Sequence, residues 1–267
     1  MKTIFTRKPH RRLLILLGGF ISVLLVLLLL PAVLTPVALL SEISSATPPT
    51  MLRQPSEIPP TVLRQPDEKP TLLSVPVLSQ YPDYPTGCEV VTATMALHYM
   101  GEPVSVDTLI DRHLSTSTGW YRWKGVYYGP DPSEYFLGNP RSTASYGCYA
   151  PVIRNMLISY LGDEARVTDA TGLSLSALCE RYIDCGVPVI LWATMNMSPI
   201  KPGASWVLPD GSTFTWPGRE HCLLLVGYDE DAYYFNDPRE GKCLSYPKAT
   251  VQKRYAEMGN QALVINS

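Results

Sequence analysis

The chain has 267 residues, of which 46% are hydrophobic, so it is long enough for one or two domains with a sizeable core. Its formal net charge is −2, but the first forty residues hold five basic groups and no acidic group. The remainder therefore carries 17 basic groups against 24 acidic ones, and this acidic balance argues against a nucleic-acid partner.

The N-terminal sequence predicts a membrane segment. Basic residues gather in 1–12, and an apolar run begins at Leu13 and can extend to Leu40. A run of this length can span a bilayer as a helix, and its basic flank should stay on the cytoplasmic side. We therefore expect a cytoplasmic tail over 1–12, a transmembrane signal-anchor over 13–40, and an extracytoplasmic remainder. Secretion after signal cleavage is the alternative, although the apolar run is long for a signal peptide.

Residues 41–71 are rich in proline and predict a linker. The motif at residues 50–55 returns at 61–66. Proline-rich sequence of this kind favours the extended polyproline II conformation. We expect a spacer that holds a folded domain of residues 72–267 away from the membrane, with peptide recognition by the repeat as a second interpretation.

Residues 84–91 predict the start of a buried helix that carries a nucleophilic thiol. Thr86 and Glu89 have the spacing of a capping box, which places Cys88 in the first turn. The unpaired N–H groups and the helix dipole favour an anion there, so the pKa of the Cys88 thiol should fall. Gly101 fits the C-terminal end of this helix. Because unpaired cysteines are usually small buried hydrophobes, this hypothesis depends on residues further along the chain.

Other elements follow from periodicity and from turn residues. They are a short strand over 72–79, a helix capped by Ser105 and ending near His113, helices over 151–161 and 175–185, a buried strand over 187–194, and a hairpin over 205–216.

The segment 115–146 is a long insertion that contains seven Trp, Tyr and Phe residues before its last position. Such long loops are usually functional or disordered, and the aromatic content argues against disorder. A lid, a packed local core and a ligand groove all remain open as its role.

A second informative stretch starts at His221, where an apolar strand begins. A turn at 230–231 and a returning strand over 232–237 follow, and Pro238 ends that strand because it cannot donate to the ladder. Cys222 lies on the opposite face from His221 and should belong to the core. Of the other histidines, His10 precedes the membrane segment, His98 is too far along the helix from Cys88, and His113 should be at the surface.

The length of the turn decides which side chain can orient His221. A turn with an odd number of residues places Asp237 on the His221 face, one diagonal step away. A turn with an even number places Asn236 there and directs Asp237 away from His221.

These residues together resemble the C39-like peptidase family, a branch of the papain-like cysteine peptidases that is related to the double-glycine leader peptidases of bacteriocin exporters. The matching positions are Gln80, residues 85–89, His221, residues 224–228 and residues 236–238. The resemblance implies an α+β papain-like fold, in which a helical part with the cysteine helix packs on an antiparallel sheet that carries His and Asp.

The resemblance also implies roles for four residues. Cys88 would be the nucleophile, His221 the general base and acid, Asp237 its orienting partner, and Gln80 a side-chain donor to the oxyanion. The family pattern favours the odd turn. The aromatic insertion has no counterpart in the family, so the substrate preference does not carry over, and neither does coupling of cleavage to export.

The sequence therefore predicts a membrane-anchored extracytoplasmic cysteine peptidase that acts on peptides or proteins through a covalent acyl-enzyme and uses no cofactor. A thiol acyltransferase or amidase acting on cell-wall peptide, and a non-catalytic module with an aromatic ligand loop, are the alternatives.

Cys148 is a weaker candidate nucleophile because it lacks a nearby glutamine and a capping carboxylate. We expect mostly free thiols, and we expect no metal site because no CxxC or HxxxH spacing occurs. The oligomeric state stays open.

Overall fold

The computed structural model describes residues 71–266 of the chain. The predicted tail and signal-anchor and nearly all of the linker lie outside these residues, so they remain predictions. Within the described range, no helix is both long enough and apolar enough to cross a membrane.

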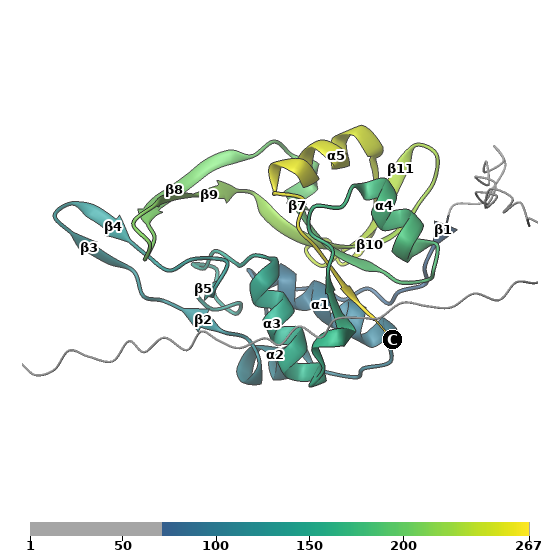
Figure 1. Cartoon of the computed structure of the whole chain (residues 1–267), viewed down its shortest axis with the longest axis horizontal. Coiled ribbons are helices and arrows are strands. Elements are labelled where there is room, and N and C mark those ends of the chain that lie inside the picture. Colours follow the sequence, from purple (N-terminus) through teal and green to yellow (C-terminus); the bar gives the residue numbers. More distant parts are fainter. Residues whose placement is uncertain (1–70, 267) are drawn as a thin grey trace, which may run out of the picture. The chain divides into compact units, whose positions relative to one another are not determined.

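A seven-stranded antiparallel sheet forms the centre of the folded unit (Figure 1). Six strands follow the order β12–β11–β10–β7–β13–β6, and β1 pairs with β10. The strands are β1 (Thr71–Leu72), β6 (Val167–Asp169), β7 (Val189–Thr194), β10 (Glu220–Tyr228), β11 (Ala232–Asp237), β12 (Lys242–Pro247) and β13 (Ala262–Ile265). The buried strand predicted over 187–194 is confirmed as β7, which lies inside the sheet.

Helices cover both faces of this sheet (Figure 1). One face packs against α1 (Cys88–Tyr99), α2 (Val106–Arg112) and α3 (Ala150–Leu161), and the other against α4 (Leu175–Leu178) and α5 (Lys248–Glu257). Successive residues of β10 alternate between the two cores, with Cys222 and Leu224 on the α1 side and Leu223 and Leu225 on the α5 side. Burial on both faces explains why the sequence of β10 is a continuous apolar run. The combination of helices and an antiparallel sheet agrees with the predicted α+β class.

The predicted ends of several helices are confirmed. Ser105 caps α2 by accepting a hydrogen bond from the Thr108 amide, and Gly162 ends α3 in the left-handed conformation. Gly101 likewise has a positive φ just after α1. The helix predicted over 175–185 is shorter in its α part, because α4 passes into a π-helical turn at Cys179–Ile183. Short 3₁₀ turns occupy Glu164–Arg166 and Met195–Met197.

The prediction of a capping box at the start of α1 is wrong. The N-cap is Gly87, and no side chain caps the helix. The Thr86 hydroxyl instead donates to the Ser142 carbonyl at 3.0 Å, and Glu89 turns into the core. A glycine fits at the N-cap because a Cβ there would lie only 3.0 Å from the Tyr84 Cβ.

The strand predicted over 72–79 is also mostly wrong, because only its first residue belongs to β1. Pro76 lies in the middle of the segment and has no N–H to donate to a ladder. The segment is held by separate contacts: the Leu73 amide donates to the Val226 carbonyl at 2.8 Å, and the Asn236 side chain donates to the Val75 carbonyl at 2.9 Å.

The aromatic insertion is ordered and joins a second sheet, which extends to the left in Figure 1. This sheet has the order β3–β4–β8–β9 and combines the insertion with the predicted hairpin, which is confirmed. Its strands are β3 (Tyr121–Trp123), β4 (Val126–Tyr128), β8 (Lys201–Val207) and β9 (Thr213–Gly218), and β2 (Thr116–Ser117) pairs in parallel with β5 (Phe136–Leu137). Trp206, Trp216 and Leu137 form a separate small core beneath it. A packed local core is therefore one role of the insertion.

The register between β10 and β11 differs from both alternatives considered for the turn. Near the turn, Tyr228 pairs with Tyr233, which leaves an even number of residues between them. The register then shifts between Leu225 and Gly227, so that Leu224 pairs with Asn236. One extra residue on β10 therefore forms a β-bulge and brings Asp237 back to the His221 face. The predicted position of Asp237 is confirmed, but the bulge produces it and the turn does not.

A hydrogen bond connects α1 to β10 and gives a first test of the fold. The Thr92 hydroxyl donates to the Cys222 carbonyl at 3.1 Å, and both residues are fully buried. We expect Thr92→Val to lower the free energy of unfolding by about 1–2 kcal/mol, because the isosteric side chain leaves a buried carbonyl without this donor. Urea denaturation measures the change.

The matched control is Thr94→Val. The Thr94 hydroxyl is equally buried but donates to the Val90 carbonyl within the same helix, where the backbone already supplies a donor. Its loss should cost clearly less, and equal losses in the two variants would contradict a specific link between helix and sheet.

Candidate active site

Cys88 is the first residue of α1 and is 6% exposed. Its thiol donates to the Glu89 carboxylate, with Sγ 3.3 Å from Oε2. The predicted fall in its pKa is wrong: burial raises the pKa of Cys88 well above its usual range, and the Glu89 and Glu220 carboxylates raise it further. The helix N-terminus would lower the pKa of the thiol, but burial beside two acidic groups has the larger, opposite effect.

His221 and Asp237 form a buried pair, each 1% exposed. His221 Nε2 lies 2.8 Å from Asp237 Oδ1. That same oxygen accepts the Arg239 amide at 2.8 Å, so the carboxylate is held from two directions. Burial raises the pKa of Asp237, but the hydrogen bond from His221 and the backbone amides outweigh it, and the net shift is downward. The pair fixes the ring so that Nδ1 remains available for another partner.

Gln80 lies in the loop between β1 and α1 and is 3% exposed. Its backbone amide donates to the Pro238 carbonyl at 2.8 Å, next to Asp237. Its side-chain Nε2 donates to the Pro85 carbonyl at 2.9 Å, next to the start of α1. Gln80 is therefore held between the loop that leads to Cys88 and the end of the strand that carries Asp237.

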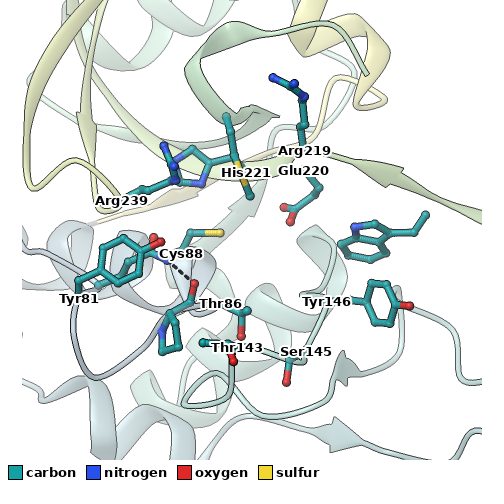
Figure 2. Close-up of a pocket in the computed structure, with 14 residues that line it drawn as sticks. Tyr81, Thr86, Cys88, Thr143, Ser145, Tyr146, Arg219, Glu220, His221 and Arg239 are labelled. Atoms are coloured by element: carbon teal, nitrogen blue, oxygen red, sulfur yellow. Dashed lines mark hydrogen bonds between the residues drawn. The ribbon is translucent and has the colours of Figure 1, made fainter. Parts of the chain in front are cut away.

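One cleft of about 270 Å³ brings three of the four predicted residues together (Figure 2). Cys88, His221 and Gln80 all line it, and Asp237 supports His221 from behind. In Figure 2 the His221 ring lies over the side of the cleft that holds Cys88. Among residues 71–266, the Cys88 thiol makes its hydrogen bond to Glu89 and none to His221.

The cleft also contains residues that the sequence reasoning missed. Glu220 and Arg219 precede His221 and line the cleft, as does Arg239 beyond β11. Arg219 has a φ of 78°, an uncommon value for a residue with a side chain, at the junction where β9 passes into β10. The signal that could have revealed Glu220 and Glu89 is their position directly beside the predicted His and Cys in the sequence.

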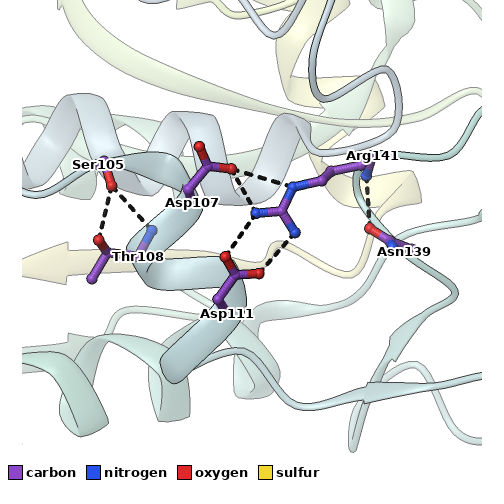
Figure 3. Close-up of polar contacts among 6 residues, drawn as sticks. All are labelled: Ser105, Asp107, Thr108, Asp111, Asn139 and Arg141. Atoms are coloured by element: carbon purple, nitrogen blue, oxygen red, sulfur yellow. Dashed lines mark hydrogen bonds and ion pairs between the residues drawn. The ribbon is translucent and has the colours of Figure 1, made fainter.

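The loop that follows β5 forms another wall of the cleft. Thr143 and Ser145 of this loop line the cleft. Arg141 connects the loop to α2 through ion pairs with Asp107 and Asp111 (Figure 3). These ion pairs are partly exposed, so they position the loop and contribute little to stability.

Cys148, His98 and His113 have structural surroundings. All six cysteines lie in the described range and are free thiols. Cys148 is fully buried, burial raises its pKa well above the usual range, and its carbonyl accepts the Trp192 indole N–H at 2.9 Å. His98 contacts the Val104 carbonyl, and His113 contacts Ser159. Cys88 lines the cleft with His221 and Cys148 does not, which favours Cys88 as the nucleophile.

Three buried side chains beside the cleft carry atoms that could bind a metal ion, and these atoms lie close together. The ligand atoms of Cys88, Glu89 and Glu220 lie within 4.8 Å of one another. Both oxygens of Glu89 already accept hydrogen bonds, from the Cys88 thiol and from the Cys148 amide. A proton is therefore the cation that this group accommodates most simply.

Comparison with known proteins identifies the family. Residues 72–263 match the model of the Peptidase C39-like family, and the chain belongs to that family. The predicted resemblance is confirmed, and the family is one of peptidases.

Two particular relatives agree with this assignment. The chain is 33% identical over 183 residues to the uncharacterized protein YvpB of Bacillus subtilis (strain 168), across 67% of this chain and 68% of that protein. It is also similar to the crystal structure of a Bacillus anthracis protein provisionally described as a C39-like peptidase, with a TM-score of 0.66 and 26% identity, across 75% of this chain and 98% of that one.

Proposed function

We propose that the protein is a cysteine peptidase that cleaves peptide bonds through Cys88, His221 and Asp237. The observation that carries the proposal is the shared cleft: the thiol and the imidazole line one cavity, and a buried carboxylate 2.8 Å from Nε2 holds the imidazole. Membership of a peptidase family supports a peptide or protein substrate.

The reaction begins with a proton transfer. The Cys88 side chain turns from Glu89 toward His221, and Nδ1 of His221 takes the thiol proton. The resulting thiolate attacks the substrate carbonyl, and the carbonyl electron pair moves to oxygen. The Asp237 carboxylate stabilises the imidazolium and holds the ring in place.

Two donors suit the negative oxygen of the tetrahedral intermediate. The Cys88 amide is one of the first N–H groups of α1, which have no acceptor within the helix, and Gln80 Nε2 uses one of its two hydrogens on the Pro85 carbonyl. The imidazolium then protonates the leaving amine, which gives an acyl-enzyme. A water molecule, deprotonated by His221, releases the acid and restores the thiol.

The proposed location rests on the sequence alone. The basic tail and the apolar run over 13–40 support a membrane anchor with the N-terminus in the cytoplasm and the peptidase outside. The linker would then hold the cleft away from the membrane.

Variants of the proposed catalytic residues test the assignment. Because Cys185 and Cys243 are exposed, both should first be changed to serine so that alkylation reports on the cleft. In this background, Cys88→Ala should abolish both iodoacetamide labelling of the site and peptide hydrolysis, and His221→Ala should remove hydrolysis. Gln80→Ala should lower kcat by about 10²–10³-fold, the usual effect of one oxyanion donor.

Mass-spectrometric peptide mapping and digestion of a peptide library provide the measurements, and Cys148→Ala is the matched control. Hydrolysis that survives Cys88→Ala would contradict the assignment. Cleavage of muropeptides alone would favour an amidase of cell-wall peptide, and ligand binding without any turnover would favour a non-catalytic module.

An aromatic cavity next to the cleft gives the substrate a second contact. Its volume is about 290 Å³, and its wall includes Trp120, Tyr127, Tyr146 and Trp206. Tyr146 also lines the catalytic cleft, so the two spaces adjoin. The wall is mainly apolar, which favours an apolar side chain of a polypeptide substrate.

Tyr127 gives a test of this contact because its side chain is 55% exposed and its removal should leave the fold intact. We expect Tyr127→Ala to raise KM about three- to tenfold, the loss of one aromatic contact worth about 0.5–1.5 kcal/mol. Trp123→Ala is the control, because Trp123 is equally exposed and lines neither cavity. Equal KM values in wild type and Tyr127→Ala would exclude the aromatic cavity from substrate binding.

A further inference from the structure

Two carboxylates are buried behind the candidate nucleophile. Glu89 is 0% exposed and Glu220 is 4% exposed. Within residues 71–266, neither carboxylate forms an ion pair with lysine, arginine or histidine. The mechanism proposed above uses neither of them, although buried charges without a compensating partner are costly.

Hydrogen bonds make the two carboxylates unequal. Glu89 Oε1 accepts the Cys148 amide at 2.6 Å, and Oε2 accepts the Cys88 thiol at 3.3 Å. Glu220 Oε1 has no hydrogen-bond partner in the described range. In Figure 2 the Glu220 carboxylate extends into the cleft from the strand that carries His221. Glu89 is therefore in direct contact with the sulfur, and Glu220 is the member of the pair that lines the cleft.

Gly147 shows how closely the two carboxylates approach. A Cβ at Gly147 would clash with Glu89 Oε1 and would lie 3.1 Å from Glu220 Oε2. Both side chains thus pack against the same glycine. Two like charges this close and this deeply buried do not ionise together, so the pair retains a proton over part of the pH range.

The groups around the pair leave its charge uncompensated. Burial raises the pKa values of Cys88, Cys148, Cys222 and Tyr149, so these neighbours are neutral near neutral pH. Burial also raises the pKa of Glu89 to about 7 and that of Glu220 well above its usual range. Within the described residues, the other charged or titratable side chains that line the cleft with Glu220 are Arg219, Arg239, His221, Cys88, Tyr81 and Tyr146.

We propose that Glu89 is a positioning residue that controls the protonation of Cys88 through the proton that lies between its Oε2 and the sulfur. The inference rests on the proposed role of Cys88 as nucleophile. When Glu89 is ionised, its Oε2 accepts the thiol proton in a hydrogen bond and keeps the thiol neutral, and the 3.3 Å contact between Sγ and Oε2 permits this bond. When Oε2 carries the proton, it donates to the sulfur instead, which stabilises the thiolate while His221 holds the proton that the thiol has lost.

The sign of the pH dependence follows from this arrangement. As the pH rises through about 7, Glu89 loses its proton and the reactive form disappears. The alkylation rate of Cys88 should therefore fall on the alkaline side, by about tenfold per pH unit. An ordinary thiol behaves in the opposite way, because its reactive anion increases as the pH rises.

Three variants of the full chain, each with Cys185 and Cys243 changed to serine, test the proposal. Iodoacetamide labelling of Cys88 is followed by peptide mapping from about pH 6 to about pH 8.5, a range centred near the expected transition. Glu89→Gln places a permanent N–H donor beside the sulfur and preserves the acceptor for Cys148. It should remove the alkaline fall and react about tenfold faster than wild type one pH unit above the transition.

Glu220→Gln should behave differently from Glu89→Gln. Burial is the main cause of the raised pKa of Glu89, and Glu89 in turn raises the pKa of Glu220, so Glu220 is the neutral member of the pair when Glu89 ionises. A neutral glutamine at position 220 should therefore leave the alkaline fall in labelling in place. Glu230→Gln is the matched control, because Glu230 is exposed in the turn after β10, and it should reproduce the wild-type profile.

The outcomes separate this inference from the proposed function. If wild type and Glu89→Gln label Cys88 with the same pH profile, or if Glu220→Gln removes the alkaline fall, the nucleophile assignment stands and the role of Glu89 is refuted. If Glu89→Gln labels more slowly at every pH, Glu89 has only a structural role and the proposal is also refuted. If Cys88 cannot be labelled in wild type at any pH, the proposed function fails first. Should Glu89→Gln not fold, the wild-type profile still decides the question, because a labelling rate that rises with pH through about 7 refutes the role of Glu89.

Discussion

The hydrogen bond between His221 and Asp237 depends on one extra residue in β10. The two residues lie on adjacent antiparallel strands, and side chains alternate between faces along each strand. A shift of one residue would replace Asp237 by Asn236 on the His221 face. The bulge between Leu225 and Gly227 prevents that shift, because it converts the register set at the turn into the register required at the site. Bulges often occur near active sites for this reason.

The position of Cys88 depends on the same sheet. Helix α1 packs against β10. The hydrogen bond from Thr92 to the Cys222 carbonyl joins the two elements at the residue directly after His221. The backbone of Gln80 is held beside Asp237 while its side chain is held beside the start of α1. Helix, strand and loop are therefore aligned by direct bonds, which makes a cleft with a defined arrangement of thiol, imidazole and amide.

Much of this arrangement could be predicted from the sequence, because local patterns determine it. The apolar runs gave the buried strands, and Ser105, Gly162 and Pro238 marked real element ends. The pairing of His221 with Asp237 could be expected from strand alternation together with the family pattern. Glu89 is the opposite case. Its spacing from Thr86 indicated a helix cap, but tertiary contacts with Ser142 and Cys148 gave both side chains other partners.

The features that could not be predicted all depend on contacts distant in the sequence. A bulge leaves no reliable mark in one strand, since it exists only relative to the neighbouring strand. The raised pKa of Cys88 follows first from burial and then from Glu89 and Glu220, and Glu220 is distant in sequence and becomes a neighbour only through packing of α1 on β10. The aromatic insertion formed a sheet because residues 201–218 supply its partner strands, and nothing within the insertion itself indicates that partner.

The most direct test of the account is a crystal structure of the protein after reaction with a peptide aldehyde. We expect a covalent bond from Cys88 Sγ to the aldehyde carbon, with the oxygen accepting hydrogen bonds from the Cys88 amide and from Gln80. His221 should lie against the adduct and keep its bond to Asp237. An adduct on Cys148 or Cys222, or an adduct on Cys88 with the His221 ring turned away from it, would contradict the account.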